Sequence, residues 1–110
     1  MKKQTIINKI NAKEDFSHYI NKDKKRYIVA LKNLHTSTNP SMNYFNIYND
    51  IYNINTDFNI LGGWQDKKTE KYYVDYCNTY HNKKEAIKKA KQLKEVAIYD
   101  TKEDKEILIK

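Results

Sequence analysis

Few residues of this chain have the types and spacing needed for metal binding or nucleophilic catalysis. The sequence holds one cysteine and three histidines. Cys77 and His81 have the spacing of half a metal site, which leaves only His18 and His35 as further nitrogen ligands. Zinc takes four ligands, or three and a water, from closely paired positions. We therefore expect neither a metal nor a cofactor, and we interpret Cys77 as a buried thiol and His81 as a loop residue.

Two aspartates and a pair of glycines supply the remaining catalytic hypotheses. Asp66 and Asp75 flank an expected hairpin and could act as a carboxylate pair in acid–base catalysis or Mg²⁺ binding, although solvated turn charges are commoner. Gly62 and Gly63 do not form a phosphate-binding loop, because they precede a strand and no Gly-Lys-Ser/Thr motif follows. We expect Gly63 to permit a bulge or a positive φ before Trp64. No residue is predicted to be catalytic, and the protein is not expected to be an enzyme.

Basic and aromatic positions are the stronger candidates, because they suit binding. One row of lysines recurs at i, i+4 and i+7, the spacing of one helix face. Such a row could follow phosphates or an acidic protein surface, although a solvated helix face is the commoner explanation. A second basic cluster precedes residue 27, and exposed tyrosines could stack on unpaired bases. The candidate binding residues are Lys24, Lys25, Arg26, Tyr76, Tyr80, Lys84, Lys88 and Lys91.

The formal net charge of +7 is unevenly distributed along the chain. Residues 1–32 carry nine Lys or Arg and three acids, residues 33–66 carry three Asp and no Lys or Arg, and residues 67–110 carry twelve Lys and eight acids. An excess of basic residues favours polyanionic partners. Arg26 is the only arginine, and the guanidinium fork is what pairs with guanine, so we do not expect sequence-specific DNA recognition.

The length of 110 residues predicts one domain, over 1–110. A single cysteine excludes an internal disulfide and fits a reducing cytoplasm. No segment approaches the roughly 18 apolar residues of a membrane span, and the basic N-terminus lacks the apolar stretch of a signal peptide. We therefore expect a protein of the cytoplasm that does not contact a membrane.

Hydrophobic periodicity predicts an α+β fold, with a mostly antiparallel sheet built from hairpins and the helices packed on one face. The expected order is α-ββ-α-ββ-α-ββ. Its elements are a helix over 3–11, a hairpin of strands over 16–20 and 27–31, a loop over 35–41, a helix over 42–54, a hairpin of strands over 57–61 and 71–76, a helix after Asn82, and a hairpin of strands over 95–99 and 106–109. Ser41 and Asn82 are the expected helix N-caps. Trp64 is expected in the core.

The second half of the chain contains a set of ordered motifs. Gly62-Gly63-Trp64-x-Asp66-x-x-Thr69-x-Lys71-Tyr72-Tyr73-x-Asp75 is followed by Lys84-Glu85-Ala86-x-x-x-Ala90 and by Ala97-Ile98-Tyr99-Asp100. Over about residues 61–100 this pattern resembles small uncharacterised proteins of phages and other mobile elements, which share a Gly-Gly-Trp hairpin, a Glu-Ala helix and a final Ala-Ile-Tyr/Phe-Asp strand. The chain departs from that pattern at Glu70, where a glycine is expected, so its turn could differ.

The resemblance implies a mobile-element origin and, by association, a relation to counter-defence factors such as anti-CRISPR proteins. We therefore hypothesise a non-catalytic, stoichiometric inhibitor that occludes a protein or nucleic-acid binding surface of a host complex, such as a CRISPR nuclease. The first alternative is an accessory protein that binds nucleic acid without sequence preference through its basic and tyrosine-rich surface. A small nuclease and an interaction role unrelated to defence are further alternatives, and the oligomeric state is left open.

Overall fold

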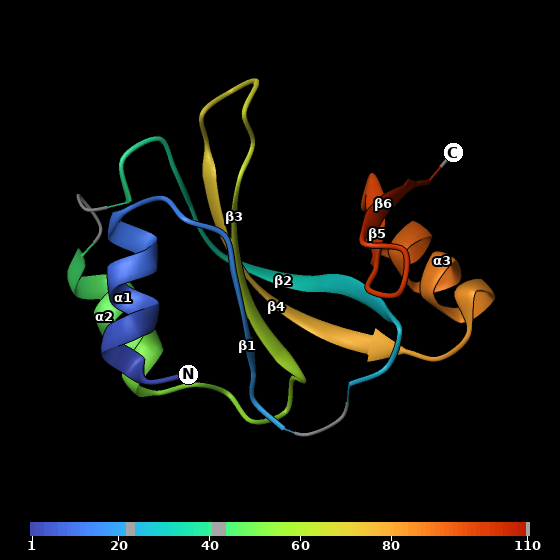
Figure 1. Cartoon of the computed structure of the whole chain (residues 1–110), viewed down its shortest axis with the longest axis horizontal. Helices are drawn as coiled ribbons and strands as arrows, with labels where there is room; N and C mark the ends of the chain where they lie inside the picture. Colours follow the sequence, from blue (N-terminus) through green and yellow to red (C-terminus); the bar gives the residue numbers. More distant parts are fainter. Residues whose placement is uncertain (22–23, 41–43, 110) are drawn as a thin grey trace.

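The computed structural model describes residues 1–21, 24–40 and 44–109, with the backbone alone for residues 44–46. Its elements, in chain order, are α1 (Lys3–Asn11), β1 (Phe16–Tyr19), β2 (Tyr27–Ser37), α2 (Tyr44–Tyr52), β3 (Ile60–Gln65), β4 (Tyr72–Tyr80), α3 (Lys83–Gln92), β5 (Ala97–Asp100) and β6 (Lys105–Leu108) (Figure 1). The predicted α+β class and the order α-ββ-α-ββ-α-ββ are confirmed. The expected N-cap Ser41 lies outside the described residues.

The six described strands form one sheet in the order β1-β3-β4-β2-β5-β6, with every neighbouring pair antiparallel. The predicted hairpins β3–β4 and β5–β6 are present. The predicted first hairpin is wrong, because β1 pairs with β3 while β2 lies between β4 and β5. β2 begins with an apolar run, Tyr27–Leu31, that is at least half-buried on both faces, which suits a central strand. The four-residue β1 suits an edge.

Strands β2 and β4 form the long central pair of the sheet. β2 continues through the first part of the predicted loop, because its backbone keeps a partner in β4 as far as Ser37, which lies opposite Tyr72. The register between the two strands shifts twice, between Ala30 and Lys32 and between Asn33 and His35. Such irregularities bend a strand and increase its twist. The sheet is therefore strongly curled, as Figure 1 shows.

The alternation of side chains along β4 separates two faces of the sheet. Tyr72, Val74 and Tyr76 are buried in the core beneath α1 and α2. Asp75 and Cys77 point to the opposite face, because successive strand residues alternate. Both are buried although no described helix covers that face. We call it the concave face.

Two apolar clusters attach the helices to the other face. The first packs Ile6, Ile7 and Ile10 of α1, with Ile47 and Ile51 of α2, onto β1, β3 and β4. The second packs α3 onto the opposite end of the sheet; it holds Tyr27, Val29, Ala86, Ala90 and Ile98. Each fully buried isoleucine contributes roughly 1.5–3 kcal/mol relative to an exposed one. The helices thus lie at the two ends of one sheet face, which agrees with the prediction (Figure 1).

Trp64 does not lie in the core, so the prediction that it does is wrong. The side chain is 41% exposed, and its ring stacks on that of Tyr73 with centroids 4.7 Å apart. Trp64 lies opposite Tyr73 in the β3–β4 ladder, so both rings share the concave face with Asp75. The residue that enters the core at this point of β3 is the neighbouring Gly63, because strand side chains alternate.

A glycine is required at position 63 because a side chain has no room there, and not because the backbone conformation demands one. Neither glycine has a positive φ, and Gly63 sits in regular register between Phe16 and Val74, so the expected bulge or positive φ is absent there. A Cβ at Gly63 would overlap the Phe16 ring and the Tyr72 hydroxyl. A Cβ at Gly62 would meet only the Phe16 carbonyl oxygen at 3.7 Å and the Cys77 sulfur at 3.9 Å, which is ordinary contact. Gly63 therefore makes room for two core rings.

Candidate functional site

The lysine face, defined as Lys84, Lys88 and Lys91, lies on the outer side of α3. Asn82 caps this helix as predicted: its side-chain oxygen accepts a hydrogen bond from the Lys84 backbone N–H at 2.8 Å. Ala86, on the inner side, is fully buried. The three lysines are exposed, and none forms an ion pair with a described residue. The helix as a whole carries five lysines against one glutamate, so its outer side is strongly positive.

The loop before β2 lies at the same end of the sheet as α3. Burial and the charge of Glu85 raise the pKa of the Tyr80 hydroxyl, and the nearby charge of Lys25 partly offsets this. Arg26 lines a shallow depression together with Lys83 of α3. The ammonium group of Lys24 lies over the ring of Tyr19, 4.9 Å from its centroid. The loop and the start of α3 thus meet at a depression in which Arg26, Lys83 and Lys105 are balanced by Asp100, Glu103 and Glu106.

Arg26 forms a two-point ion pair with an acidic residue of β5. Its guanidinium donates two hydrogen bonds of 2.8 Å to the carboxylate of Asp100, whose side chain is almost fully buried. This carboxylate neutralises the charge of the guanidinium in a charge-assisted, two-point contact. Arg26 thus ties the start of β2 to β5, while its side chain remains 36% exposed, and its place in the binding set stays a prediction.

Tyr76 is wrongly placed in the predicted binding set. Its side chain is only 4% exposed, its ring stacks on Phe58, and its hydroxyl accepts a hydrogen bond from the Asn55 backbone N–H at 2.8 Å. Both the ring and the hydroxyl of Tyr76 therefore have partners inside the protein. Tyr80, four residues further along β4, is half-buried and keeps contact with the surface.

The residues considered for catalysis do not come together. Asp66 organises the β3–β4 turn: its carboxylate accepts hydrogen bonds from the Lys68 backbone N–H and the Thr69 hydroxyl. Asp75 lies opposite Gly62, four residues along β3 from Asp66, or about 13 Å at the usual rise per residue. Among the described residues no group of three His, Cys, Asp or Glu could hold a metal ion. The hypothetical carboxylate pair is therefore wrong.

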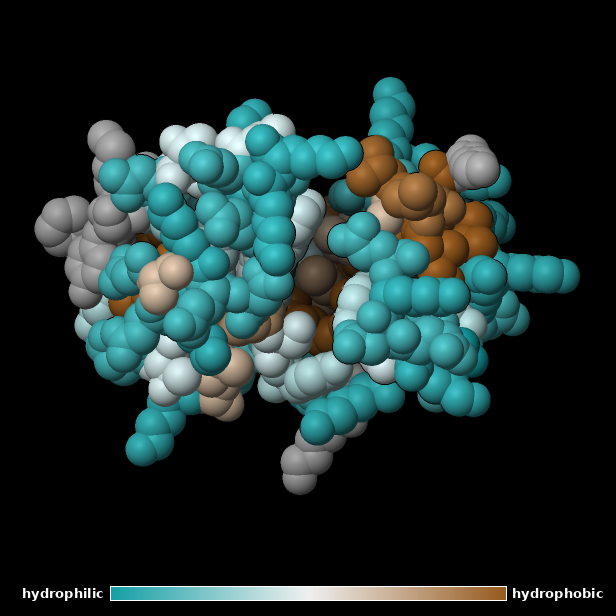
Figure 2. Space-filling view, turned by 45° about the horizontal axis from the view of Figure 1, so that its top comes forward, coloured by the Kyte–Doolittle hydropathy of each residue, from teal (hydrophilic) through white to brown (hydrophobic). Residues whose placement is uncertain are grey.

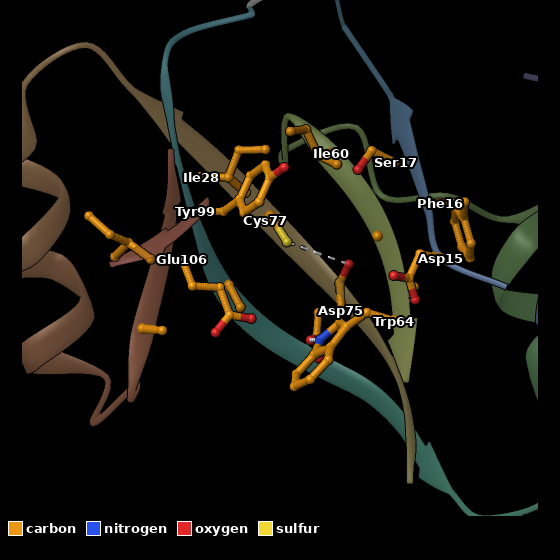
Figure 3. A pocket seen from close by; sticks show the side chains of 15 residues that line it. Asp15, Phe16, Ser17, Ile28, Ile60, Trp64, Asp75, Cys77, Tyr99 and Glu106 are labelled. Atoms are coloured by element: carbon orange, nitrogen blue, oxygen red, sulfur yellow. Dashed lines mark hydrogen bonds between the residues drawn. The ribbon is translucent and has the colours of Figure 1, made fainter. Parts of the chain in front are cut away.

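The concave face holds a cavity that the sequence did not predict. Its volume is about 500 Å³. Figure 2 shows a hollow near the middle of the surface with hydrophobic atoms at its bottom. Every described strand has a residue in the lining, which consists of Asp15, Phe16, Ser17, Ile28, Ala30, Ile60, Gly62, Gly63, Trp64, Asp75, Cys77, Ala97, Ile98, Tyr99 and Glu106. Figure 3 shows Asp75 and Cys77 between a wall that carries Trp64 and a wall that carries Tyr99 and Glu106.

Asp75 is the most buried charged group of this cavity. It is 7% exposed and accepts hydrogen bonds from Nδ2 of Asn33 at 2.8 Å and from Nε1 of Trp64 at 3.4 Å. Burial raises the pKa of its carboxyl group, and the two hydrogen bonds only partly offset that effect. The charge of Asp75 in turn raises the pKa of the Glu95 carboxyl, after burial as the larger cause. Asp75 is therefore a buried carboxylate of the cavity whose ionised form is disfavoured by its surroundings.

Cys77 beside it is unsuited to nucleophilic chemistry. Burial, followed by the charges of Asp75 and Glu95, raises the pKa of its thiol to about 12. A thiol acts as a nucleophile in its ionised form, which is scarce at neutral pH under these conditions. Its role as a lining group of the cavity agrees with the predicted buried thiol, and His81 is exposed just after β4.

The fold and these two surfaces define a small α+β protein with a basic helix at one end of its sheet and an acidic cavity on the concave face. Comparisons with protein families, with curated proteins and with solved structures found no match to this chain. None of the described helices is long and apolar enough to cross a membrane.

Proposed function

We propose that this protein acts without catalysis, by binding, and that it inhibits a nucleic-acid-targeting defence nuclease of the host by covering one of its surfaces. The observation that carries the proposal is the lysine face: three exposed lysines on one side of α3 that have no acidic partner among the described residues. The resemblance of residues 61–100 to mobile-element proteins directs the proposal toward host defence.

The proposed binding depends on electrostatic complementarity between the lysine face and its partner, and on a scaffold that holds the lysine face in place. Ala86 and Ala90 hold α3 tightly on the sheet, so the helix presents its lysines from a backbone that is already ordered. A positive surface of this kind speeds the encounter with an acidic surface of the partner protein. Tyr80 and Tyr19, beside the basic loop, add ring area at low entropic cost.

The proposal is tested by mixing the purified protein with a panel of reconstituted CRISPR nucleases at about equimolar ratio and measuring target cleavage. We expect at least one nuclease to lose cleavage and to co-purify with the protein. Normal cleavage across the panel, without co-purification, contradicts the proposal.

Binding of nucleic acid without sequence preference is the second candidate. It is favoured by the position of Lys24 over the half-buried Tyr19 ring, because a cation beside an aromatic ring suits unpaired bases. It predicts that single-stranded DNA binds at low salt and is released steeply as salt rises. A gel-shift assay that stays negative at low salt removes this candidate.

A further inference from the structure

The concave cavity is built as a small-molecule site, independently of the lysine face. Its volume of about 500 Å³ falls in the range of roughly 300–1,000 Å³ that is usual for ligand pockets. β4 and β2 supply its floor with Cys77, Ile28 and Ala30, and the outer strands curl up on both sides. The floor is apolar, while the polar groups are few and stand around it, as is typical of such sites.

The residues that line the cavity carry negative charge, whereas the protein as a whole carries positive charge. The chain carries 21 Lys and Arg against 14 Asp and Glu, yet none of the described residues that line the cavity is a lysine or an arginine. Three carboxylates are present instead, those of Asp15, Asp75 and Glu106. Asp75 is held there at 7% exposure with only neutral hydrogen-bond donors, Asn33 and Trp64. A buried carboxylate without a counter-charge is costly, so a cation in the cavity would relieve that cost.

An aromatic group stands beside the same carboxylate. The indole of Trp64 is 41% exposed at the edge of the cavity; one side of its ring stacks on Tyr73, and its N–H is directed to Asp75 (Figure 3). Trp64 offers the best π-face among the side chains for an ammonium group. Tyr99 supplies a second ring from the opposite wall.

We propose that the concave cavity binds a small organic cation: an ammonium group attached to an apolar alkyl or aryl body. The ammonium group lies between Asp75, Glu106 and the Trp64 ring, and the apolar body lies on Ile28 and Ile60. A metal ion fits less well, since among the described residues no three acidic, histidine or cysteine side chains are close enough to hold one. The volume of the cavity suits a free small molecule.

Trp64 is the only tryptophan of the chain and lies in the cavity wall, so its fluorescence reports occupancy directly. The experiment titrates the protein with a panel of alkyl and aryl amines, for example phenethylammonium, and with the matched alcohols and carboxylates. We expect a saturable change for amines, with binding about tenfold or more tighter than for the alcohols, because a hydrogen bond to a charged partner is worth about 1.5–3 kcal/mol. No saturable change with any amine at millimolar concentration, or equal binding of the alcohols, overturns the proposal.

Two variants locate the site and one separates it from the lysine face. Gly62→Leu fills the cavity from β3, where a Cβ has ordinary contacts only, and should abolish binding. Glu106→Gln changes an exposed residue and should weaken amine binding several-fold without affecting the fold. Lys88→Glu, outside the cavity, should leave amine binding unchanged. Undiminished binding by folded Gly62→Leu, checked by circular dichroism, contradicts the assignment to this cavity whatever the lysine face does.

Discussion

Arg26 and Asp100 form a two-point ion pair across 74 positions of sequence. Nε and Nη2 of Arg26 each donate to a different carboxylate oxygen at 2.8 Å. Asp100 also accepts hydrogen bonds from the backbone N–H groups of Lys102 and Glu103. The hydrogen bonds from Arg26 are the main cause that holds the pKa of Asp100 well below its usual range, and they raise that of Arg26. The pair fixes the end of β5 to the start of β2.

Loss of this pair should remove a pH-dependent part of the stability. Because the folded-state pKa of Asp100 is lowered, its contribution is fully present above the unfolded value of about 3.9 and is lost as the pH falls below it. Arg26→Met should therefore lower the free energy of unfolding most at neutral pH, and the difference from the wild type should shrink below about pH 4. Urea unfolding at several pH values measures this. A difference that is independent of pH contradicts it.

Asp75 should show the opposite dependence. Its folded-state pKa is raised, mainly by burial, so the ionised form opposes folding and stability falls as the pH rises above the unfolded value. Asp75→Asn removes that effect. We expect the stability of Asp75→Asn relative to the wild type to increase from acid to neutral pH. The exposed Asp57, changed to Asn, is the control for the loss of one charge. A relative stability that falls over the same range contradicts the assigned burial.

The two glycines should differ sharply in their tolerance of a methyl group. Gly63→Ala forces the added carbon into Phe16 and Tyr72, and we expect a loss of about 3 kcal/mol, the upper range for overpacked cores. Gly62→Ala meets only ordinary contacts and should change stability by less than about 1 kcal/mol. Thermal unfolding of the pair provides the comparison. Similar melting temperatures for the two variants would show that Gly63 is not sterically required.

Glu70 holds a backbone conformation that suits glycine. Its φ is 63°, in the left-handed region that glycine adopts without strain. The turn thus keeps the glycine conformation with a glutamate in it, at a cost of roughly 1–2 kcal/mol. Glu70→Gly should raise the free energy of unfolding by about 1 kcal/mol, since the flexibility of glycine offsets part of the gain. Lys68→Gly, in the same turn without a positive φ, should give no gain.

Local signals in the sequence predicted the local structure. The Asn82 cap depends on contacts within a few residues, and it was predicted correctly. The pairing of β1 with β3 depends on residues more than forty positions apart, such as Phe16 opposite Gly63, and periodicity does not encode it. This is why the first hairpin was wrong.

Which residues of the central strands face the core was the second feature that local sequence patterns did not predict. Both alternating sets of β4 contain tyrosine or other apolar groups, so the pattern alone did not show that Tyr76 is buried. A large apolar residue usually faces the core and a glycine the surface. Gly63 and Trp64 are placed the other way round, because the rings of Phe16 and Tyr72 already fill the core there. A signal for the cavity was present: residues 33–66, which include β3, contain no lysine or arginine.

The most direct measurement of the central claim compares two charge-reversal variants in binding and cleavage assays with the inhibited nuclease. Lys84→Glu/Lys88→Glu/Lys91→Glu reverses the lysine face, while Lys67→Glu/Lys68→Glu/Lys71→Glu makes the same change of net charge on exposed residues at the β3–β4 turn. We predict that both variants fold, that the first loses binding and inhibition by at least roughly tenfold, and that the second keeps most of both. Equal loss by the two variants, or full inhibition by the first, contradicts the claim that the lysine face is the binding surface.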